Sequence, residues 1–145
     1  MLLTALVSFS CNNDNSTSDK ISTEAVNNPA SAVEKDVDPT SLPIMTFEKE
    51  SYDFGKITQG EKVAHTYFFT NTGKSDLIIT SAKGSCGCTV PEYPKKPIAP
   101  GEKGAIEVVF DSEGKSGKQH KTVTILANTQ PATTVIAITG TIVVP

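Results

Sequence analysis

Short runs of alternating apolar and polar residues constrain this chain to β structure from residue 44 onward. The clearest run is 63–70, where one set of alternate residues is Val63, His65, Tyr67 and Phe69. A period of two is typical of a strand with one buried face, because successive side chains point to opposite sides of a sheet. Further apolar runs follow at 77–82, 106–111, 122–127 and 133–144. None of them has a helical period, so strands are expected throughout.

Turn residues separate these runs. Asn71-Thr72-Gly73-Lys74 ends the first run and predicts a hairpin with 77–82, and 100–102 and 113–117 combine Gly with Pro, Ser or charged residues. Short strands at this spacing, in about 100 residues, are typical of a sandwich of two sheets. We therefore predict an all-β fold for residues 44–145, an immunoglobulin-like antiparallel β-sandwich. An eight-stranded barrel is the less favoured alternative.

The first 11 residues are similar to a bacterial lipoprotein signal that ends at Cys11. The apolar stretch before Cys11 has about half of the roughly 20 residues that a membrane-spanning helix needs. The small residue Ser10 precedes the cysteine, although no Lys or Arg comes before it and Ser8 stands where such signals usually carry Leu or Val. We predict that Cys11 is lipidated. A buried or free thiol is the alternative.

Residues 12–43 are rich in Asn, Ser, Thr, Asp and Pro and have no persistent apolar period, which predicts a disordered acidic linker. From Cys11 to Pro43 there are six acidic residues and two lysines, whereas the remainder carries 11 lysines and 10 acidic residues. The domain has no Arg and no Trp, which argues against a nucleic-acid partner. We expect a protein of the cell envelope, anchored to a membrane by its lipid, facing the periplasm or the cell surface.

Several motifs occur in an order that resembles a known bacterial family. The motifs are Tyr52–Ile57, Phe68–Gly73, Ser85–Thr89, Ile98–Glu102, Val109–Asp111 and Ile138–Gly140. Together they resemble the family called domain of unknown function 1573 (DUF1573), over almost all of Phe47–Val143. The resemblance implies an immunoglobulin-like sandwich related to the major sperm protein and pilus-chaperone type of domain, on exported and often lipidated proteins. It implies no specific activity.

The run Cys86-Gly87-Cys88 holds the most reactive chemistry in the domain. Residues two apart in a strand share a face, which would suit a shared metal ion. Gly87 could take a positive φ and bend the chain enough for a disulfide, and a disulfide over so short a loop would be a poor staple and a plausible redox switch. Two thiols that only pack near a strand end are the third alternative. The sequence leaves all three open.

A metal site would need further ligands, and the sequence offers few. Thiolates favour Cu or Zn, and a closed zinc site takes four ligands. The imidazoles are His65 and His120, with Met45 a possible thioether. His65 lies on an apolar strand face and is expected to pack there, while His120 is expected in a solvated turn. We therefore predict no cofactor, with Cu or Zn as the alternative.

No serine, histidine and carboxylate combination stands out, so we predict that the chain is not an enzyme. Asp53 and Asp111 are expected to cap turns. The segment 91–97 contains three prolines and is expected to cross between sheets, with a recognition loop as the alternative. Its candidate binding residues are Glu92, Tyr93, Lys95 and Lys96. The resulting hypothesis is a membrane-anchored module that binds an unknown protein partner, the alternative being thiol redox or metal handling at the two cysteines.

Overall fold

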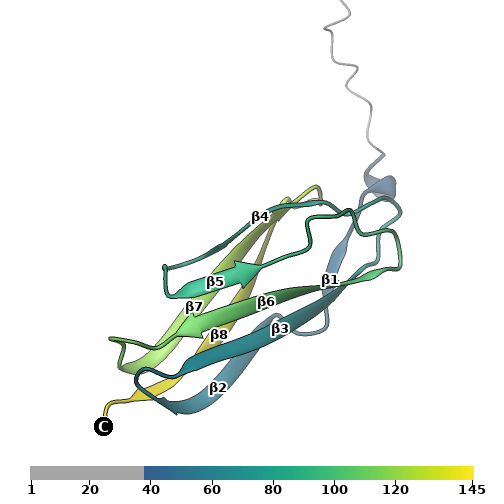
Figure 1. The fold of residues 1–145 in the computed structure, drawn as a ribbon. Helices are drawn as coiled ribbons and strands as arrows, with labels where there is room; N and C mark the ends of the chain where they lie inside the picture. The colour runs from purple at the N-terminus through teal and green to yellow at the C-terminus, as the bar shows by residue number, and fades with distance from the viewer. Residues whose placement is uncertain (1–37) are drawn as a thin grey trace, which may run out of the picture. The chain divides into compact units, whose positions relative to one another are not determined.

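The computed structural model describes residues 38–145. In it the predicted strands form two stacked four-stranded sheets, and buried and exposed residues alternate along the strands (Figure 1). Sheet A has the strand order β1 (Met45–Phe47), β3 (Lys62–Asn71), β6 (Lys103–Asp111) and β5 (Thr89–Glu92). Sheet B has the order β2 (Ser51–Thr58), β8 (Thr133–Val143), β7 (Gly117–Ala127) and β4 (Ile79–Gly84). The predicted all-β, immunoglobulin-like sandwich is confirmed.

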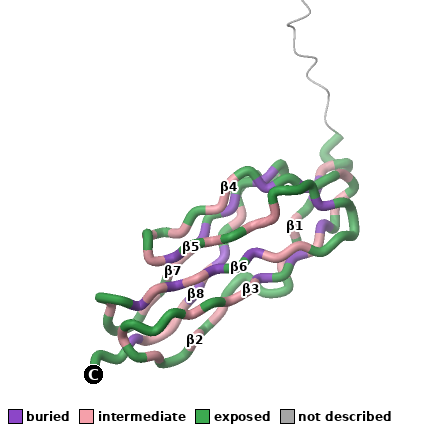
Figure 2. The backbone as a smooth tube through the Cα atoms, in the orientation of Figure 1, coloured by how far each residue is buried: buried purple, intermediate pink, exposed green. Residues whose placement is uncertain are grey.

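The core fills the space between the sheets, where the buried positions of both sheets alternate with exposed ones (Figure 2). On β3, Tyr67 and Phe69 are buried while Phe68 between them is exposed. The main cluster of buried side chains comprises Tyr67, Phe69, Leu77, Ile79, Ile98, Ile106, Val108, Val123, Ile125, Ala127 and Ile136. A second cluster is formed by Phe110, Ile138 and Ile142. The alternation read from the sequence therefore sorts core from surface.

Two pairings differ from the expected ones. β2 runs parallel to β8, whereas the other strand pairs are antiparallel. These two strands are far apart in the sequence, so no tight turn fixes their relative direction. The hairpin predicted from the turn at 71–74 is wrong, because β3 belongs to sheet A and β4 to sheet B. The turn therefore carries the chain from one sheet to the other.

The sandwich begins before residue 44. Asp38 caps a short 3-10 helix, η2 (Pro39–Ser41), and Pro43 is buried. Lys74 donates a backbone hydrogen bond to Leu42, at 3.2 Å, which fixes residues 42–43 against the turn after β3. The last residues of the predicted linker thus belong to the folded part. Cys11 and the rest of the predicted signal and linker lie outside the described residues.

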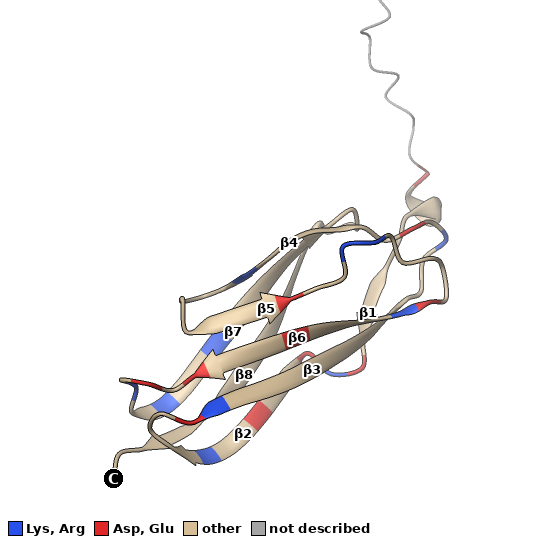
Figure 3. Ribbon diagram, viewed as in Figure 1, with Lys and Arg blue, Asp and Glu red and all other residues tan. Residues whose placement is uncertain are grey.

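Charged side chains are sparse in the middle of strands β3, β5 and β6 (Figure 3). Most of the charges in this sheet stand at strand ends, such as Lys62 and Asp111, which form an ion pair at 3.3 Å. Within residues 38–145, no helix has the length and apolar composition needed to cross a membrane.

Candidate functional site

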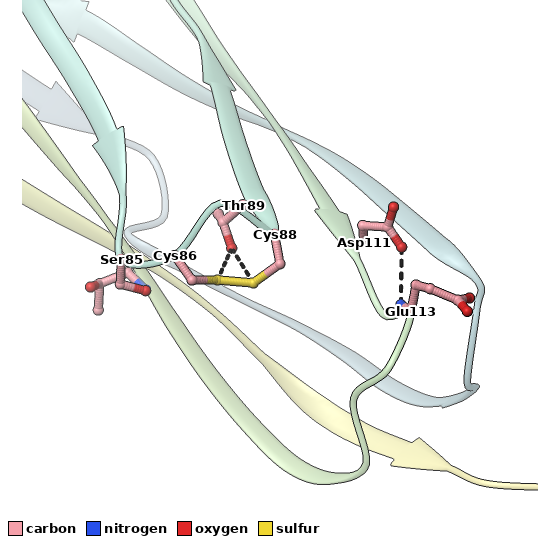
Figure 4. The surroundings of a disulfide bond; sticks show 7 residues. Ser85, Cys86, Cys88, Thr89, Asp111 and Glu113 are labelled. Atoms are coloured by element: carbon pink, nitrogen blue, oxygen red, sulfur yellow. Dashed lines mark hydrogen bonds between the residues drawn. A yellow bond between two sulfur atoms is a disulfide. The ribbon is translucent and has the colours of Figure 1, made fainter.

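The two cysteines of the domain lie in the turn that connects β4 in sheet B to β5 in sheet A (Figure 4). Before the turn, the Ser85 N–H donates to the carbonyl of Thr122 in β7, at 2.8 Å. After it, the Asp111 N–H of β6 donates to the carbonyl of Cys88, at 2.8 Å. The Thr89 N–H donates to the carbonyl of Cys86, at 3.2 Å, and closes the turn. Backbone hydrogen bonds to both sheets therefore fix this segment.

Cys86 and Cys88 form a disulfide across this turn, with their Cα atoms 5.3 Å apart. The expectation that they share the face of an extended strand is wrong, because residues 85–88 leave the strand geometry. The suggested role of Gly87 is also wrong, since its φ is not positive. The turn hydrogen bond from Thr89 to Cys86 brings the cysteines together instead.

The two sulfur atoms have different surroundings although both cysteines are half-buried. Cys88 packs against the cluster of Phe110, Ile138 and Ile142 at this end of the core. Cys86 is not part of that cluster, and an added Cβ on neighbouring Gly87 would meet no atom within 4 Å. The hydroxyl of buried Thr89 lies 3.8 Å from each sulfur (Figure 4). The turn thus has a packed side at Cys88 and an open side at Gly87.

The two aspartates that the sequence singled out serve local structure, as expected. The Asp111 carboxylate accepts a hydrogen bond from the Glu113 N–H, at 3.0 Å, and this bond holds the pKa of Asp111 below its usual value. The Asp53 carboxylate accepts from the Gly55 N–H, at 2.8 Å. Asp53 and Asp111 therefore cap turns.

His65 is a packing residue at the side of the sandwich. It stacks on Tyr52 with ring centroids 3.7 Å apart, and burial together with the charge of Lys49 lowers its pKa. His120 is exposed on β7, so the expected turn position is wrong. Across residues 38–145, no three His, Cys, Asp or Glu side chains gather as a metal-binding group.

One half of β3 has no strand beside it on the side away from β6, in the part of the chain that the structure describes. β1 pairs only with Phe69–Asn71, and the Glu48 N–H adds a bond to the Phe68 carbonyl, at 3.0 Å. Because backbone groups alternate in direction along a strand, Ala64 and Thr66 point their N–H and C=O groups to the same side as Phe68. We call residues 62–67 the open edge of β3.

A hollow of about 240 Å³ lies beside this open edge. Its lining residues are Glu48, Lys49, His65, Thr66, Tyr67 and Phe68. Phe68 is 51% exposed, although it is a large aromatic residue. Unpaired backbone groups, a hollow and an exposed aromatic ring therefore occur together.

The edge formed by β5 is less open. The Cys88–Asp111 bond and the register of β5 with β6 direct the backbone of Thr89 and Pro91 away from β6. Pro91 has no N–H, and that of Thr89 is bonded to Cys86. This edge therefore has no free donor within β5, which is a common way to protect an edge strand.

The predicted binding residues at the end of β5 and just after it are only partly available. The Tyr93 hydroxyl donates to the carbonyl of Thr80, at 3.2 Å, and the Lys95 ammonium lies 3.1 Å from the centre of the Tyr93 ring. Glu92, Lys95 and Lys96 are exposed. The segment connects β5 to β6 within sheet A, so the expected crossing between sheets is wrong.

The sequence offered one missed signal for the open edge. Phe68 occupies a position of the 63–70 alternation where Ala64 and Thr66 predict a solvent-facing side chain. A single exposed aromatic residue is common on protein surfaces, so Phe68 points to a binding surface only together with the hollow and the unpaired backbone groups beside it. The length of β1, which decides where the edge is open, has no such signal.

Comparisons with known proteins agree on the fold. A family model described as "Protein of unknown function (DUF1573)" matches residues 45–142. No curated protein sequence matches the chain. A protein of unknown function from Porphyromonas gingivalis W83 superposes with a TM-score of 0.63 and 18% identity, over 79% of this chain and 51% of that one.

Two further solved structures are also similar. An ASH / PapD-like domain of human CEP192 has a TM-score of 0.53 and 12% identity, over 74% of this chain and 89% of the domain. The YadV chaperone has a TM-score of 0.50 and 13% identity, over 67% of this chain and 51% of the chaperone. The chain thus spans about half the length of the Porphyromonas protein and of YadV. At these identities the similarity shows the fold alone.

Proposed function

The chain belongs to the DUF1573 family of proteins of unknown function, and from that premise we propose that it is a membrane-anchored binding module of the bacterial cell envelope. Its lipid would be attached at Cys11, and its binding element is the open edge of β3. The partner is another protein that contributes an extended segment to sheet A. The observation that carries this proposal is the absence of a strand beside residues 62–67 where β1 ends, within the described chain.

Backbone geometry supports strand addition at this edge. The outward N–H and C=O groups of Ala64 and Thr66 are spaced like those that pair Phe68 with Glu48 further along the strand. An incoming strand would continue the line of β1 and satisfy them. Main-chain hydrogen bonds supply affinity in this mode of recognition, and alternate side chains supply specificity.

The surroundings favour a partner segment with apolar residues. Side chains on one face of an added strand would lie next to exposed Phe68, and those on the other face would enter the hollow beside His65. The residues that line the hollow include both Glu48 and Lys49, so a partner segment of one particular charge is not favoured. An extended segment with alternating apolar residues fits this edge best.

Proline substitution tests the edge without disturbing the rest of sheet A. The β3–β6 ladder uses the odd-numbered residues of β3, as the Asn71 N–H bonded to Glu102 indicates, so proline at Thr66 removes only an outward donor. Thr66→Val is the matched control because it keeps the N–H. A photo-crosslinking residue at Phe68 in the full chain should capture a discrete partner in cells, and Val135, which is 48% exposed on β8, serves as the control position.

We expect adducts from position 68 and none from position 135, with the former lost in Thr66→Pro and kept in Thr66→Val. Equal adducts from both positions, or adducts that Thr66→Pro leaves unchanged, would show that the edge is not the binding element. An adduct with the mass of a second copy of this chain would show that the edge mediates self-assembly and does not bind another protein. Circular dichroism and melting curves of each variant show whether the sandwich is intact.

Anchoring is tested separately by intact mass. Membrane-extracted protein should lack the residues before Cys11 and carry the added mass of two or three acyl chains. Cys11→Ser should abolish both changes and release the protein from the membrane fraction. An unmodified form that begins at Met1 in the soluble fraction would exclude the lipid anchor. It would not bear on the proposal that the edge of β3 binds a partner.

A further inference from the structure

The Cys86–Cys88 disulfide lies in a turn that does not depend on it. Hydrogen bonds to Thr122 in sheet B and Asp111 in sheet A fix the two ends of the turn, and a third bond closes it. A disulfide over one intervening residue restricts the unfolded chain little. Reduction would therefore leave the sandwich folded and both thiols close together. A pair with these properties can be reduced and reoxidised repeatedly, which a structural staple cannot without loss of stability.

The surroundings distinguish the two sulfur atoms as targets. A thiolate attacks a disulfide sulfur from the side opposite its partner sulfur and releases that partner as a thiolate. Cys88 packs against the cluster around Phe110 and Ile138, and this packing restricts the approach of a thiolate to its sulfur. Cys86 is outside this cluster and follows exposed Ser85, next to the open side of the turn at Gly87. The accessible target is thus the sulfur of Cys86.

Thr89 is placed to assist the departure of Cys88. Its hydroxyl lies 3.8 Å from both sulfur atoms, and it is the only one of the three groups that has a hydrogen to donate while the disulfide is intact. Thr89 itself is 3% exposed, so water competes little for this hydroxyl. A hydrogen bond to the sulfur that becomes a thiolate lowers the cost of forming that charge beside the apolar cluster.

We infer that Cys86 and Cys88 are a thiol–disulfide exchange site whose substrate is a dithiol. One substrate thiolate attacks the Cys86 sulfur, the Cys86–Cys88 bond breaks, and Cys88 leaves as a thiolate that accepts a hydrogen bond from Thr89. The second substrate thiolate then attacks the substrate sulfur of the mixed disulfide and releases Cys86. Two electrons pass to the protein, the substrate becomes a disulfide, and the two substrate protons end on Cys86 and Cys88. The site does not require the open edge of β3.

The test uses the full chain with Cys11→Ser, so that only two cysteines are counted. The oxidised protein is mixed with one equivalent of a reduced dithiol peptide, and both are alkylated and weighed. We expect one peptide disulfide and two protein thiols for each exchange, with the melting curve of the reduced protein showing a single cooperative transition. If the peptide and dithiothreitol reduce the disulfide only in denaturant, the disulfide is a structural one and the inference is overturned.

Single-cysteine variants test which sulfur is attacked. Cys88→Ser leaves Cys86 alone and Cys86→Ser leaves Cys88 alone. Each is converted to its mixed disulfide with glutathione, and the rate of release by dithiothreitol is measured in the folded protein. Glutathione should be released at least tenfold faster from Cys86 than from Cys88. Equal rates would overturn the assignment of Cys86 as the attacked sulfur. With both Cys86 and Cys88 present, Thr89→Val should slow reduction of the disulfide severalfold, and Thr89→Ser should restore the wild-type rate. If Thr89→Val is reduced as fast as the wild type, the hydroxyl has no such role.

Discussion

The rings of Tyr52 and His65 stack with their planes 6° apart and so connect the two sheets, Tyr52 from β2 and His65 from β3. His65 also meets the ring of Tyr67 edge-on, with centroids 4.7 Å apart. Its pKa is lowered by burial and then by the positive charge of Lys49. The folded state therefore favours the neutral imidazole, and this imidazole is part of the lining of the hollow beside β3.

Acidification should destabilise the sandwich through His65. The unfolded chain binds this proton near the ordinary pKa of about 6.5, whereas the folded chain binds it only at lower pH. The contribution is fully present above the ordinary pKa and is lost as pH falls through the lowered one. We expect the melting temperature to fall over this window, and His65→Phe to reduce the fall because its ring still packs between Tyr52 and Tyr67 but cannot titrate. An unchanged slope in His65→Phe would assign the pH dependence to other groups.

Asn71 should be far more important to stability than its place in a turn motif suggests. Its side-chain amide donates to the carbonyls of Ser75 and Ile98, at 2.8 and 2.9 Å, and the residue is fully buried. Asn71→Ala removes the side-chain bond to the Ser75 carbonyl and one of the two bonds at the Ile98 carbonyl, which keeps the Leu77 N–H, and it should lower the free energy of unfolding by about 1 to 3 kcal/mol. Asn128 makes similar bonds to Ile78 and Asp76 in an exposed position. Urea unfolding of Asn128→Ala should show a loss below about 1 kcal/mol, because water replaces the amide. Equal losses would show that burial does not set the cost.

Asn71 also shows how far local sequence chemistry reaches. The turn at 71–74 could be predicted because Asn and Gly have local backbone preferences. The bond to Ile98 could not, since it joins residues 27 positions apart that only the complete fold brings together. The false hairpin has the same origin. Turn residues predict that a strand ends, but the sheet that the next strand joins is decided by packing in the core.

The candidate sites divide in the same way. Alternation along 63–70 identified the inner and outer faces of β3, because side-chain direction is a local property of a strand. The open edge could not be predicted, since it depends on where β1 stops pairing with β3. A spacing of two fits a strand as well as a turn, so the state of Cys86 and Cys88 stayed undecided. Hydrogen bonds to distant Thr122 and Asp111 set the turn that pairs them.

The hydroxyl of Tyr67 joins the two sheets and should make the fold sensitive to alkali. It donates to the carbonyl of Ala137 in β8, at 2.7 Å, and burial, with a smaller effect of Tyr52, raises its pKa to about 12. Its contribution is fully present below the ordinary pKa of about 10 and is lost as pH rises through the raised value. Tyr67→Phe should lower the free energy of unfolding by about 0.5 to 1.5 kcal/mol at neutral pH. It should also lose less stability than the wild type as the pH rises above about 10. Denaturant unfolding at pH 7 and 11 measures both effects, and a variant as stable and as alkali-sensitive as the wild type would contradict them.

A side chain at Gly104 should destabilise the fold, because Gly104 lies against an aromatic ring of the core. A Cβ added there would clash with the ring of Phe69, which is fully buried and packs against Phe47 with centroids 5.5 Å apart. Gly104 does not have a positive φ, so steric overlap rather than backbone strain is the expected cause. Gly104→Ala should therefore lower the free energy of unfolding by about 1 to 3 kcal/mol, as overpacking of a core does. Gly87→Ala is the matched control, since it also lacks a positive φ but has open space around it, and its effect should stay within about 0.5 kcal/mol. Urea unfolding of both variants decides the matter, because equal effects would mean that the Phe69 ring yields to the added methyl group.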